Sequence, residues 1–408
     1  MKRVVITGAA GVSPIGLDWP QMREALQNHR SGIVRMDDWA AYDGLNTQLG
    51  GPVPGFEVPA HFNRKVTRTM GRVSKMAVAV TEQALDQAGL LDEPCIQDGR
   101  MGVAYGSSTG STDAVMEFGG MLLNKSLDGL NATSYIRMMA HTAAVNIGVH
   151  FGLKGRVHTT SSACTSGSQG IGYAFEAIRA GKQQLMVAGG AEELCPSEAA
   201  VFDTLYATST KNDTPTQTPS PFDADRDGLV IGEGACTLIL EELEHAQARG
   251  ATILAEIIGF ATNADGAHVT RPSSETMEVV MRLGLADAGI AADDVGYVCA
   301  HGTATEQGDI AESQATWRVF GGSTPVSSLK GHTGHTLGAC GALESWAAVQ
   351  MMNEGWCAPT LNLQQPDERC GALDYVMTAT RPLDTGIVVN NNFAFGGINT
   401  SLVFRRWT

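Results

Sequence analysis

A single cysteine lies in a run of small residues in the segment RVHTTSSACTSGSQGIGYAF, at 156–175. Its serine, alanine and threonine neighbours leave room for a substrate beside the sulfur of Cys164. The residues after it have a helical pattern, so Cys164 is expected at a helix N-terminus, where the dipole and free N–H groups favour a thiolate and an oxyanion. A buried structural thiol is the other interpretation of a lone cysteine. The segment alone leaves a nucleophile and a structural thiol open.

Histidines and a lysine follow predicted strands later in the chain. CAHGTATEQGD places His301 directly after the strand VGYVCA, and SLKGHTGHTLGACGALE places Lys330, His332 and His335 after another strand. Because α/β folds carry their chemistry at strand ends, these segments and Cys164 form a candidate nucleophilic site. Zinc is a rival use of cysteine and histidine, but only His332 and His335 form a close ligand pair, so no metal is expected.

Two further segments imitate ligand loops. GAAGVSPIG follows the first strand, but its glycines at 8, 11 and 16 do not have the GxGxxG spacing of a dinucleotide site. DADRDG at 223–228 begins like a calcium loop, but Gly234 replaces the glutamate at the twelfth position and a strand-like run follows. We therefore expect neither a dinucleotide nor calcium at these loops.

Strand-like and helix-like segments alternate along the chain. RVVITG, MGVAYGSS, QQLMVAGGAEE, ACTLILEE, IVVNNNFAFGG and TSLVFRR are typical of buried strands, whereas RVSKMAVAVTEQALDQAGL and TMEVVMRLGLADAGI are typical of helices that end near glycine. The alternation predicts an α/β fold with sheets covered on both faces. Each half ends with a glycine-rich strand pair, which hints at duplication, and we place the boundary near residue 250.

Composition and charge exclude several classes of function. The 408 residues carry a net charge of −15, which argues against general nucleic-acid binding. Eight cysteines are spread singly, as expected for free thiols in a reducing cytoplasm. No stretch approaches the ~18 apolar residues of a membrane span. The apolar N-terminus is broken by Gly8, Gly11 and Pro14, and so indicates a strand and turn, not a signal peptide.

Five segments, taken together, resemble a known family. TTSSACTSGSQGIGYA, PFDADRDGLVIGEGA, AHGTATEQGD, KGHTGHTLGACGALE and NNFAFGGINTSLVF are similar, in this order, to the signature segments of the β-ketoacyl-acyl-carrier-protein synthases. The resemblance runs from Met1 to Phe404. It implies an α/β, thiolase-like duplicated five-layered αβαβα fold, with an N-terminal half at 1–250 and a C-terminal half at 251–408, in a protein that is usually a dimer.

The resemblance also implies an acyltransferase activity and a set of site residues. Cys164 is then the acyl-accepting nucleophile of a decarboxylative Claisen condensation, in which malonyl-carrier protein extends the bound chain by two carbons. His301 and His335 match the family's catalytic histidines and Lys330 its lysine; Phe395 matches the gate, and its backbone N–H joins that of Cys164 in the oxyanion hole. The other implied positions are Thr303 and Thr305 at the pantetheine arm, Ser108 and Phe202 at the acyl pocket, where a small Ser108 would open the tunnel, and Lys65 and Arg68 at the carrier-docking surface.

The implied partners are an acyl-carrier protein and a second subunit, either the same chain or a related chain-length factor. No cofactor is expected, because phosphopantetheine arrives on the carrier. A thiolase is disfavoured because NNFAFGGIN lacks a second catalytic cysteine, and a chain-length factor because Cys164, His301 and His335 are all present. A cysteine protease would not explain the second histidine, the lysine or the gate. Fatty-acid elongation and a specialised polyketide or aryl-polyene pathway remain open.

Overall fold

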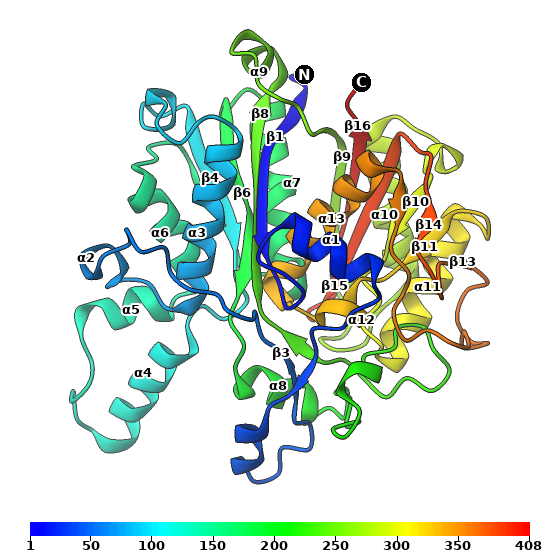
Figure 1. Cartoon of the computed structure of the whole chain (residues 1–408), viewed down its shortest axis with the longest axis horizontal. Helices are drawn as coiled ribbons and strands as arrows, with labels where there is room; N and C mark the ends of the chain where they lie inside the picture. The colour runs from blue at the N-terminus through cyan, green and yellow to red at the C-terminus, as the bar shows by residue number, and fades with distance from the viewer.

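The computed structural model describes residues 1–408, and an 11-stranded sheet runs through the molecule (Figure 1). Its N-terminal part consists, from the edge inwards, of β5 (Val157–Thr160), β4 (Met101–Gly106), β6 (Leu185–Glu192), β8 (Gly234–Glu242) and β1 (Val4–Val12). Its C-terminal part continues with β9 (Ala255–Ala264), β16 (Ile398–Arg406), β15 (Ile387–Ala394), β10 (Tyr297–Cys299), β11 (Pro325–Ser327) and β13 (Asp374–Tyr375). The predicted strands are confirmed.

The two parts of the sheet repeat one topology. In the first, β4 pairs in parallel with β5 and β6, while β8 pairs antiparallel with β6 and β1. In the second, β10, β11, β15, β16 and β9 pair in the same order with the same directions. A short antiparallel pairing of β1 with β9 joins the parts into one sheet. The repeated strand pairing agrees with the duplication that the sequence indicated. The domain boundary near residue 250 stays a prediction.

Helices form three layers around this sheet, which gives the duplicated five-layered αβαβα, thiolase-like fold (Figure 1). One outer layer holds α3 (Arg72–Gln87) and α6 (Thr142–Phe151), and the other holds α10 (Ser274–Ala288) and α11 (Glu306–Phe320). Between the two parts of the sheet lie α7 (Ser166–Arg179) and α13 (Cys340–Glu354). Helix α7 begins directly after the turn that contains Cys164. Helix α13 follows the segment that contains Lys330 and His335.

Burial explains why the central elements are rich in small and apolar residues. Strands β4, β6 and β8 are buried along their whole length because helices cover both faces. In α7, Gly172 lies so close to the ring of Phe260 that a Cβ would come within 2.2 Å of it. Small residues in α7 therefore allow the central helix to lie against the sheet and bring its N-terminus into the interior.

The remaining elements decorate this framework. The short strands are β2 (Val34–Arg35), β3 (Leu49–Gly51), β7 (Ile231–Gly232), β12 (Trp356–Cys357) and β14 (Arg381–Pro382). The other helices are α1 (Trp19–Gln27), α2 (Arg64–Thr67), α4 (Thr112–Asn124), α5 (Ala132–Met138), α8 (Pro196–Asp203), α9 (Leu243–Ala248) and α12 (Lys330–Thr333). None of the helices has the length and apolar character needed to cross a membrane. Strands follow DADRDG, as the sequence predicted.

Candidate active site

Cys164 lies in a tight 3-10 turn, Ala163–Thr165, that leads directly into α7. Ala163 adopts a left-handed conformation with φ of 49°, which is unusual for a residue with a side chain. Strain of this kind is tolerated where the surrounding structure holds it, often at functional turns. The turn places the sulfur in the interior at the N-terminus of the central helix, since Cys164 is buried.

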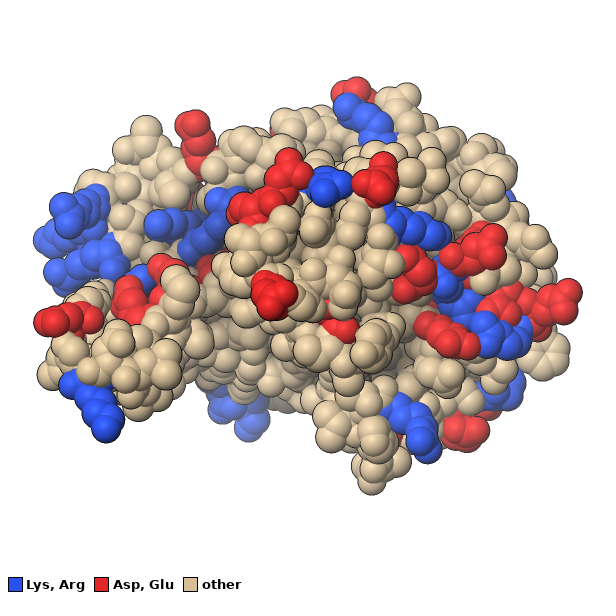
Figure 2. Space-filling model, turned by 90° about the horizontal axis from the view of Figure 1, so that it is seen from below, with Lys and Arg blue, Asp and Glu red and all other residues tan.

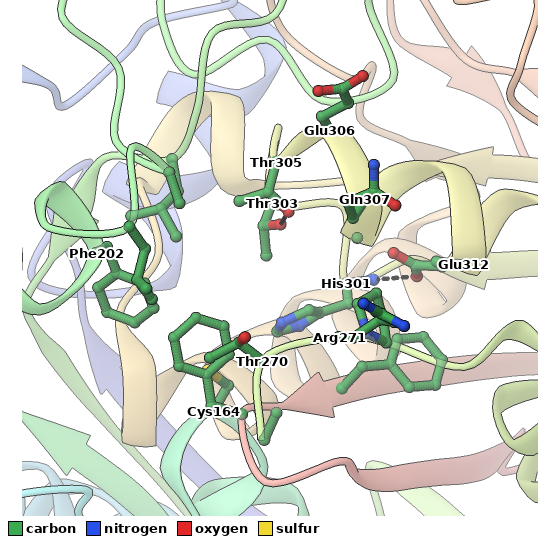
Figure 3. Close-up of a pocket in the computed structure, with 18 of the residues that line it drawn as sticks. Cys164, Phe202, Thr270, Arg271, His301, Thr303, Thr305, Glu306, Gln307 and Glu312 are labelled. Atoms are coloured by element: carbon green, nitrogen blue, oxygen red, sulfur yellow. Dashed lines mark hydrogen bonds between the residues drawn. The ribbon is translucent and has the colours of Figure 1, made fainter. Parts of the chain in front are cut away.

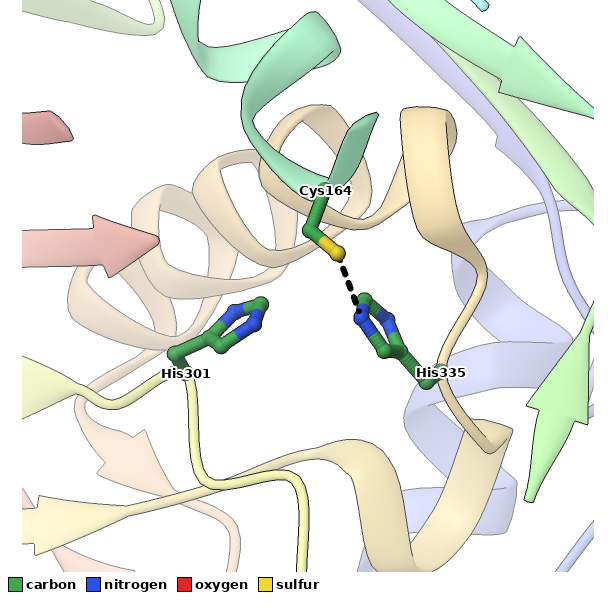
Figure 4. A group of neighbouring side chains, drawn as sticks. All are labelled: Cys164, His301 and His335. Carbon is green, nitrogen blue, oxygen red and sulfur yellow. Dashed lines mark hydrogen bonds between the residues drawn. The ribbon is translucent and has the colours of Figure 1, made fainter. Parts of the chain in front are cut away.

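His335 lies beside this sulfur (Figure 4). Its Nε2 is 3.0 Å from Sγ of Cys164, and its ring is 5.0 Å from that of His301, centroid to centroid and nearly perpendicular to it. Nδ1 of His335 is buried without a hydrogen-bond partner, so its contacts leave the tautomer free. The three side chains that the sequence placed at separate strand and helix ends are therefore brought together.

The buried Lys330 determines which ring nitrogen of His301 carries the proton. Nζ of Lys330 lies 3.2 Å from Nδ1 of His301 and 2.5 Å from Oε1 of Glu344, and Nδ2 of Asn392 lies 3.3 Å from the same Nδ1. Burial lowers the pKa of Lys330, but Glu344, Cys340 and Glu312 together outweigh it and keep the pKa raised. Because the ammonium and the amide both donate, Nδ1 of His301 accepts and its proton resides on Nε2.

The loop after β10 is held by a buried acid. Oε1 and Oε2 of Glu312 accept hydrogen bonds from the backbone N–H groups of His301 and Gly302, at 2.6 and 2.7 Å. Burial raises the pKa of Glu312 to about 8. Thr303 and Thr305, further along this loop, join their hydroxyl groups at 2.9 Å. The loop thus presents one histidine and two hydroxyls on the same side.

These groups line a cavity of about 460 Å³ (Figure 3). The predicted residues on its wall are Cys164, Phe202, His301, Thr303, Thr305, His335 and Phe395. The rings of Phe202 and Phe395 are 5.0 Å apart, so the predicted gate and an acyl-pocket residue contact each other. The cavity therefore combines a thiol, two imidazoles and a pair of hydroxyls.

The electrostatics of the thiol differ from the expectation. Burial raises the pKa of Cys164 to about 12, although Lys330 and the backbone N–H groups of Phe395 and Cys164 act in the opposite direction. A resting thiolate stabilised by the helix terminus is therefore wrong for the unliganded site. Burial, with the charge of Lys330, also lowers the pKa values of His301 and His335 well below their usual range. Near neutral pH the site holds a neutral thiol and two neutral imidazoles.

A pH profile of alkylation tests this resting state. We expect the rate at which iodoacetamide modifies Cys164 to rise by about tenfold per pH unit up to pH ~10, because only the thiolate reacts. In the urea-unfolded chain, the rate is expected to level off near the ordinary thiol pKa of ~8.5. Peptide mass spectrometry of the Cys164 peptide measures both profiles. A plateau in the folded protein below pH ~9 would contradict the neutral thiol.

The other predicted residues lie outside the cavity wall. The backbone N–H and hydroxyl of Ser108 both donate to Glu192, so this side chain is committed to an internal bond. Lys65 and Arg68 lie in and beside α2, at the surface. His332 is buried, with its ring nitrogens 2.9 and 3.2 Å from backbone carbonyls of Arg30 and Pro359, so it has no contact with Cys164.

Four residues of the site were missed by the sequence analysis. Asn392 and Glu344 contact the Lys330–His301 pair, Glu312 holds the loop, and Arg271 lies on the cavity wall without an ion-pair partner (Figure 3). Glu344 and Asn392 lie within the quoted segments GALE and NNFAF. Nothing in their spacing indicates a contact with His301, because that contact arises only when separate elements of the C-terminal half pack together.

Cys164, His301 and His335 also offer three metal-ligand atoms within 4.8 Å of one another, and so do His301, Cys340 and Glu344. The ammonium of Lys330 lies against His301, which belongs to both groups, and against Glu344 in the second. A fixed positive charge at that distance opposes a cation in either group. The donor set therefore does not fit a resident metal ion.

Taken together, a thiol beside an imidazole, a second imidazole with a fixed tautomer, and a thiolase-like fold define an enzyme of the cysteine-dependent acyl-transfer class. Two family models match the chain: "Beta-ketoacyl synthase, N-terminal domain" over residues 1–246 and "Beta-ketoacyl synthase, C-terminal domain" over residues 254–364. The chain belongs to the β-ketoacyl synthase family and is an acyltransferase.

Individual proteins agree with this family. The 3-oxoacyl-[acyl-carrier-protein] synthase 2 of Vibrio harveyi is 38% identical over 417 residues, covering 99% of each chain. The crystal structure of a β-ketoacyl synthase from Burkholderia phymatum is 57% identical, with a TM-score of 0.99 and 100% of each chain covered. Two solved assemblies match over 100% of each chain: the ishigamide ketosynthase/chain length factor, with 30% identity and a TM-score of 0.90, and a type II polyketide acyl-carrier protein with its ketosynthase, AntDE:AntF, with 31% and 0.88.

Proposed function

We propose that the chain is a 3-oxoacyl-[acyl-carrier-protein] synthase that extends a cysteine-bound acyl chain by two carbons with malonyl-carrier protein. The contact of 3.0 Å between Nε2 of His335 and Sγ of Cys164, with His301 beside it, carries this proposal. The curated relative from Vibrio harveyi bears the same activity in its name.

In the first half-reaction, the sulfur of Cys164 attacks the carbonyl carbon of the incoming thioester. Because the resting thiol is neutral, its proton moves to Nε2 of His335 as the C–S bond forms. The backbone N–H groups of Cys164 and Phe395 act on the sulfur and are positioned to hold the oxyanion. The tetrahedral intermediate then expels the carrier thiolate, which takes up the proton, and the acyl group stays on Cys164.

In the second half-reaction, malonyl-carrier protein loses carbon dioxide next to the histidines. The C–C bond to the carboxylate breaks and its electrons form an enolate, whose oxygen accepts hydrogen bonds from Nε2–H of His301 and His335. The enolate carbon attacks the carbonyl carbon of the Cys164 thioester, the C–S bond breaks, and the Cys164 thiolate takes up a proton from water. Lys330 and Asn392 keep the Nε2–H form of His301 available throughout.

The cavity wall suits a phosphopantetheine arm. Thr303 and Thr305 provide hydroxyls for its amide groups, and the exposed Arg271 provides an unpaired cation at the mouth. The arm is covalently part of the carrier substrate, so the proposed reaction uses no resident cofactor.

Intact-mass spectrometry of the purified protein with acyl- and malonyl-carrier proteins tests this function. The protein is expected to gain one acyl mass and to lose it when malonyl-carrier protein is added, with a carrier-bound β-ketoacyl product. If every donor leaves the protein unmodified, either as the purified chain or with a co-purified partner, the proposed function is wrong.

We further propose that the carrier protein docks at α2 and the start of α3, where Lys65 and Arg68 lie. Figure 2 shows Lys and Arg side chains gathered at the end of the molecule that carries α2. A surface hollow there is lined by five basic residues, Arg64, Arg68, Arg72, Lys75 and Arg137, and by two acidic ones, Asp113 and Glu193. A local basic surface of this kind attracts an acidic carrier in spite of the net charge of −15.

Charge reversal tests the docking surface. The variant Lys65→Glu/Arg68→Glu is expected to raise KM for malonyl-carrier protein by about tenfold or more at low salt, with less effect at high salt. Steady-state kinetics with malonyl-pantetheine, which has no carrier protein, should be unchanged. The matched control is Lys182→Glu, another exposed lysine, which lies after α7. Equal effects of both variants would contradict docking at α2.

A second subunit is proposed at the face formed by α4, α5 and β5. Strand β5 is an edge strand and exposes Val157. Further exposed apolar side chains lie on α4, in the loop after it, on α5 and on α6: Met116, Leu122, Leu123, Leu127, Tyr135 and Val149. Apolar exposure on this scale is typical of an interface. We propose a dimer with a second ketosynthase-fold subunit, either the same chain or a chain-length factor like that of the ishigamide ketosynthase.

The pathway is proposed only as fatty-acid or specialised polyketide elongation, including aryl-polyene formation, in the cytoplasm. All eight cysteines are free, which agrees with a reducing compartment. Among the similar proteins, AntDE is the ketosynthase of a type II polyketide system, and the Vibrio harveyi enzyme is named a 3-oxoacyl-[acyl-carrier-protein] synthase. Comparing the rates at which saturated and polyene acyl-carrier substrates load onto Cys164 distinguishes fatty-acid elongation from the specialised pathway.

A further inference from the structure

A buried acid lies one helical turn from Phe202, on α8. Residues four apart share a face of a helix, so Glu198 and Phe202 lie on the same side. Phe202 lines the cavity of Cys164, and Ala199 packs in one apolar cluster with Cys164 and Leu337. Glu198 therefore lies next to the apolar surroundings of the nucleophile, one helical turn from the cavity-lining Phe202.

A second buried acid nearby is fully satisfied. The carboxyl group of Glu192 accepts hydrogen bonds from the hydroxyls of Ser107 and Ser108 and from the backbone N–H groups of Ser108 and Gly338. Gly338 stands in the turn before α13, where a Cβ would lie 2.7 Å from Oε2 of Glu192. This dense set of donors is the environment of a carboxylate anion.

Glu198 has only one hydrogen bond. The hydroxyl of Thr109 donates to its Oε1 at 2.8 Å, whereas its Oε2 is buried with no partner, in a residue that is 4% exposed. Burial, and then the charge of Glu192, raise the pKa of Glu198 well above its usual range. Burial raises the pKa of Glu192 as well, but four donors act on its carboxyl group whereas only one acts on that of Glu198, so Glu192 holds the charge and Glu198 the proton.

An unpaired carboxyl oxygen in the interior is unfavourable unless something binds it. We propose that Glu198 hydrogen-bonds an oxygen atom of the acyl chain on Cys164, and so selects chains that carry a hydroxyl or carbonyl group over plain hydrocarbon chains. The inference rests on the proposed function and names its substrate class. A plain hydrocarbon would leave Oε2 unpaired, and a site built to pair a polar atom rejects the analogue that lacks it.

Competing acyl-carrier substrates of equal length test this selection. Each pair differs only in a terminal methyl or hydroxyl group, the chain length is varied, and intact-mass spectrometry follows the acylation of Cys164. The wild type is expected to prefer the hydroxylated chain by about tenfold at the length that reaches Glu198. Glu198→Gln keeps a hydrogen-bond donor and should retain the preference, whereas Glu198→Leu should abolish it and accelerate loading of the plain chain.

Two controls separate this inference from a defect in folding or function. Ser197→Ala alters the exposed side of α8 and should leave the preference unchanged. Acetyl-carrier protein is too short to reach Glu198 and should load all variants at the wild-type rate. If the wild type shows no preference at any length, or Glu198→Leu keeps one, the selection is overturned. If no chain loads on the wild type, the proposed function itself fails.

Discussion

Replacement of Cys164 with alanine is expected to abolish acylation, whereas replacement of His301 is expected to spare acylation and abolish decarboxylation. Cys164 provides the only sulfur that contacts His335, so its loss should lower condensation by about 10⁴-fold or more. His301 makes no hydrogen bond to the thiol but presents Nε2–H towards the malonyl position, so His301→Ala should lower decarboxylation by about 10²- to 10³-fold. Intact-mass spectrometry measures the first step, and release of labelled carbon dioxide from malonyl-carrier protein measures the second.

Cys340 provides the matched control for the nucleophile. Its Sγ donates to the backbone carbonyl of Cys164 at 3.2 Å, so it is equally buried but faces the backbone. Cys340→Ala should still take up one acyl mass. An acyl group on Cys164→Ala, or loss of acylation in His301→Ala with decarboxylation retained, would reverse the assigned roles.

Removal of the Lys330 charge is expected to have the largest effect on stability. The ammonium pairs with Glu344 at 2.5 Å and both side chains are buried, so Lys330→Met leaves an uncompensated carboxylate in the interior. Breaking such a pair costs about 3–5 kcal/mol of the free energy of unfolding. Urea unfolding of the variant measures this loss.

The double variant Lys330→Met/Glu344→Leu separates stability from function. It removes both charges, so it should recover most of the free energy of unfolding. It should still decarboxylate malonyl-carrier protein slowly, because no ammonium keeps Nδ1 of His301 as an acceptor. Full recovery of decarboxylation in the double variant would show that Lys330 acts only through the stability of the fold.

The neutral resting site has a consequence for how the enzyme works. With the pKa of Cys164 raised to about 12 and those of both histidines lowered, thiol deprotonation is coupled to attack on the substrate. The same lowered pKa values keep both imidazoles uncharged at pH 6.5, where an ordinary imidazole is half protonated. Each can therefore donate Nε2–H to the enolate over the whole neutral range, and neither competes with the other for a proton.

The sequence by itself determined the elements and the type of chemistry. Strands and helices were predicted because their apolar patterns are local, and Cys164, His301, Lys330 and His335 stood out because glycine-rich turns at strand ends expose such residues. The order of the five motifs was enough to place the chain in its family.

Only the tertiary structure decided which groups meet and in which protonation state. Cys164 and His335 are 171 positions apart, and only the packed fold brings the ring of His335, which the resemblance had already selected, against the sulfur while His332 faces backbone carbonyls. The contacts of Asn392 and Glu344 with the Lys330–His301 pair, and the open oxygen of Glu198, likewise arise where elements from different parts of the chain pack together. Burial is a property of the packed fold, so the shift of the Cys164 pKa to about 12 could not be read from a helix N-terminus, whose pattern favoured the opposite.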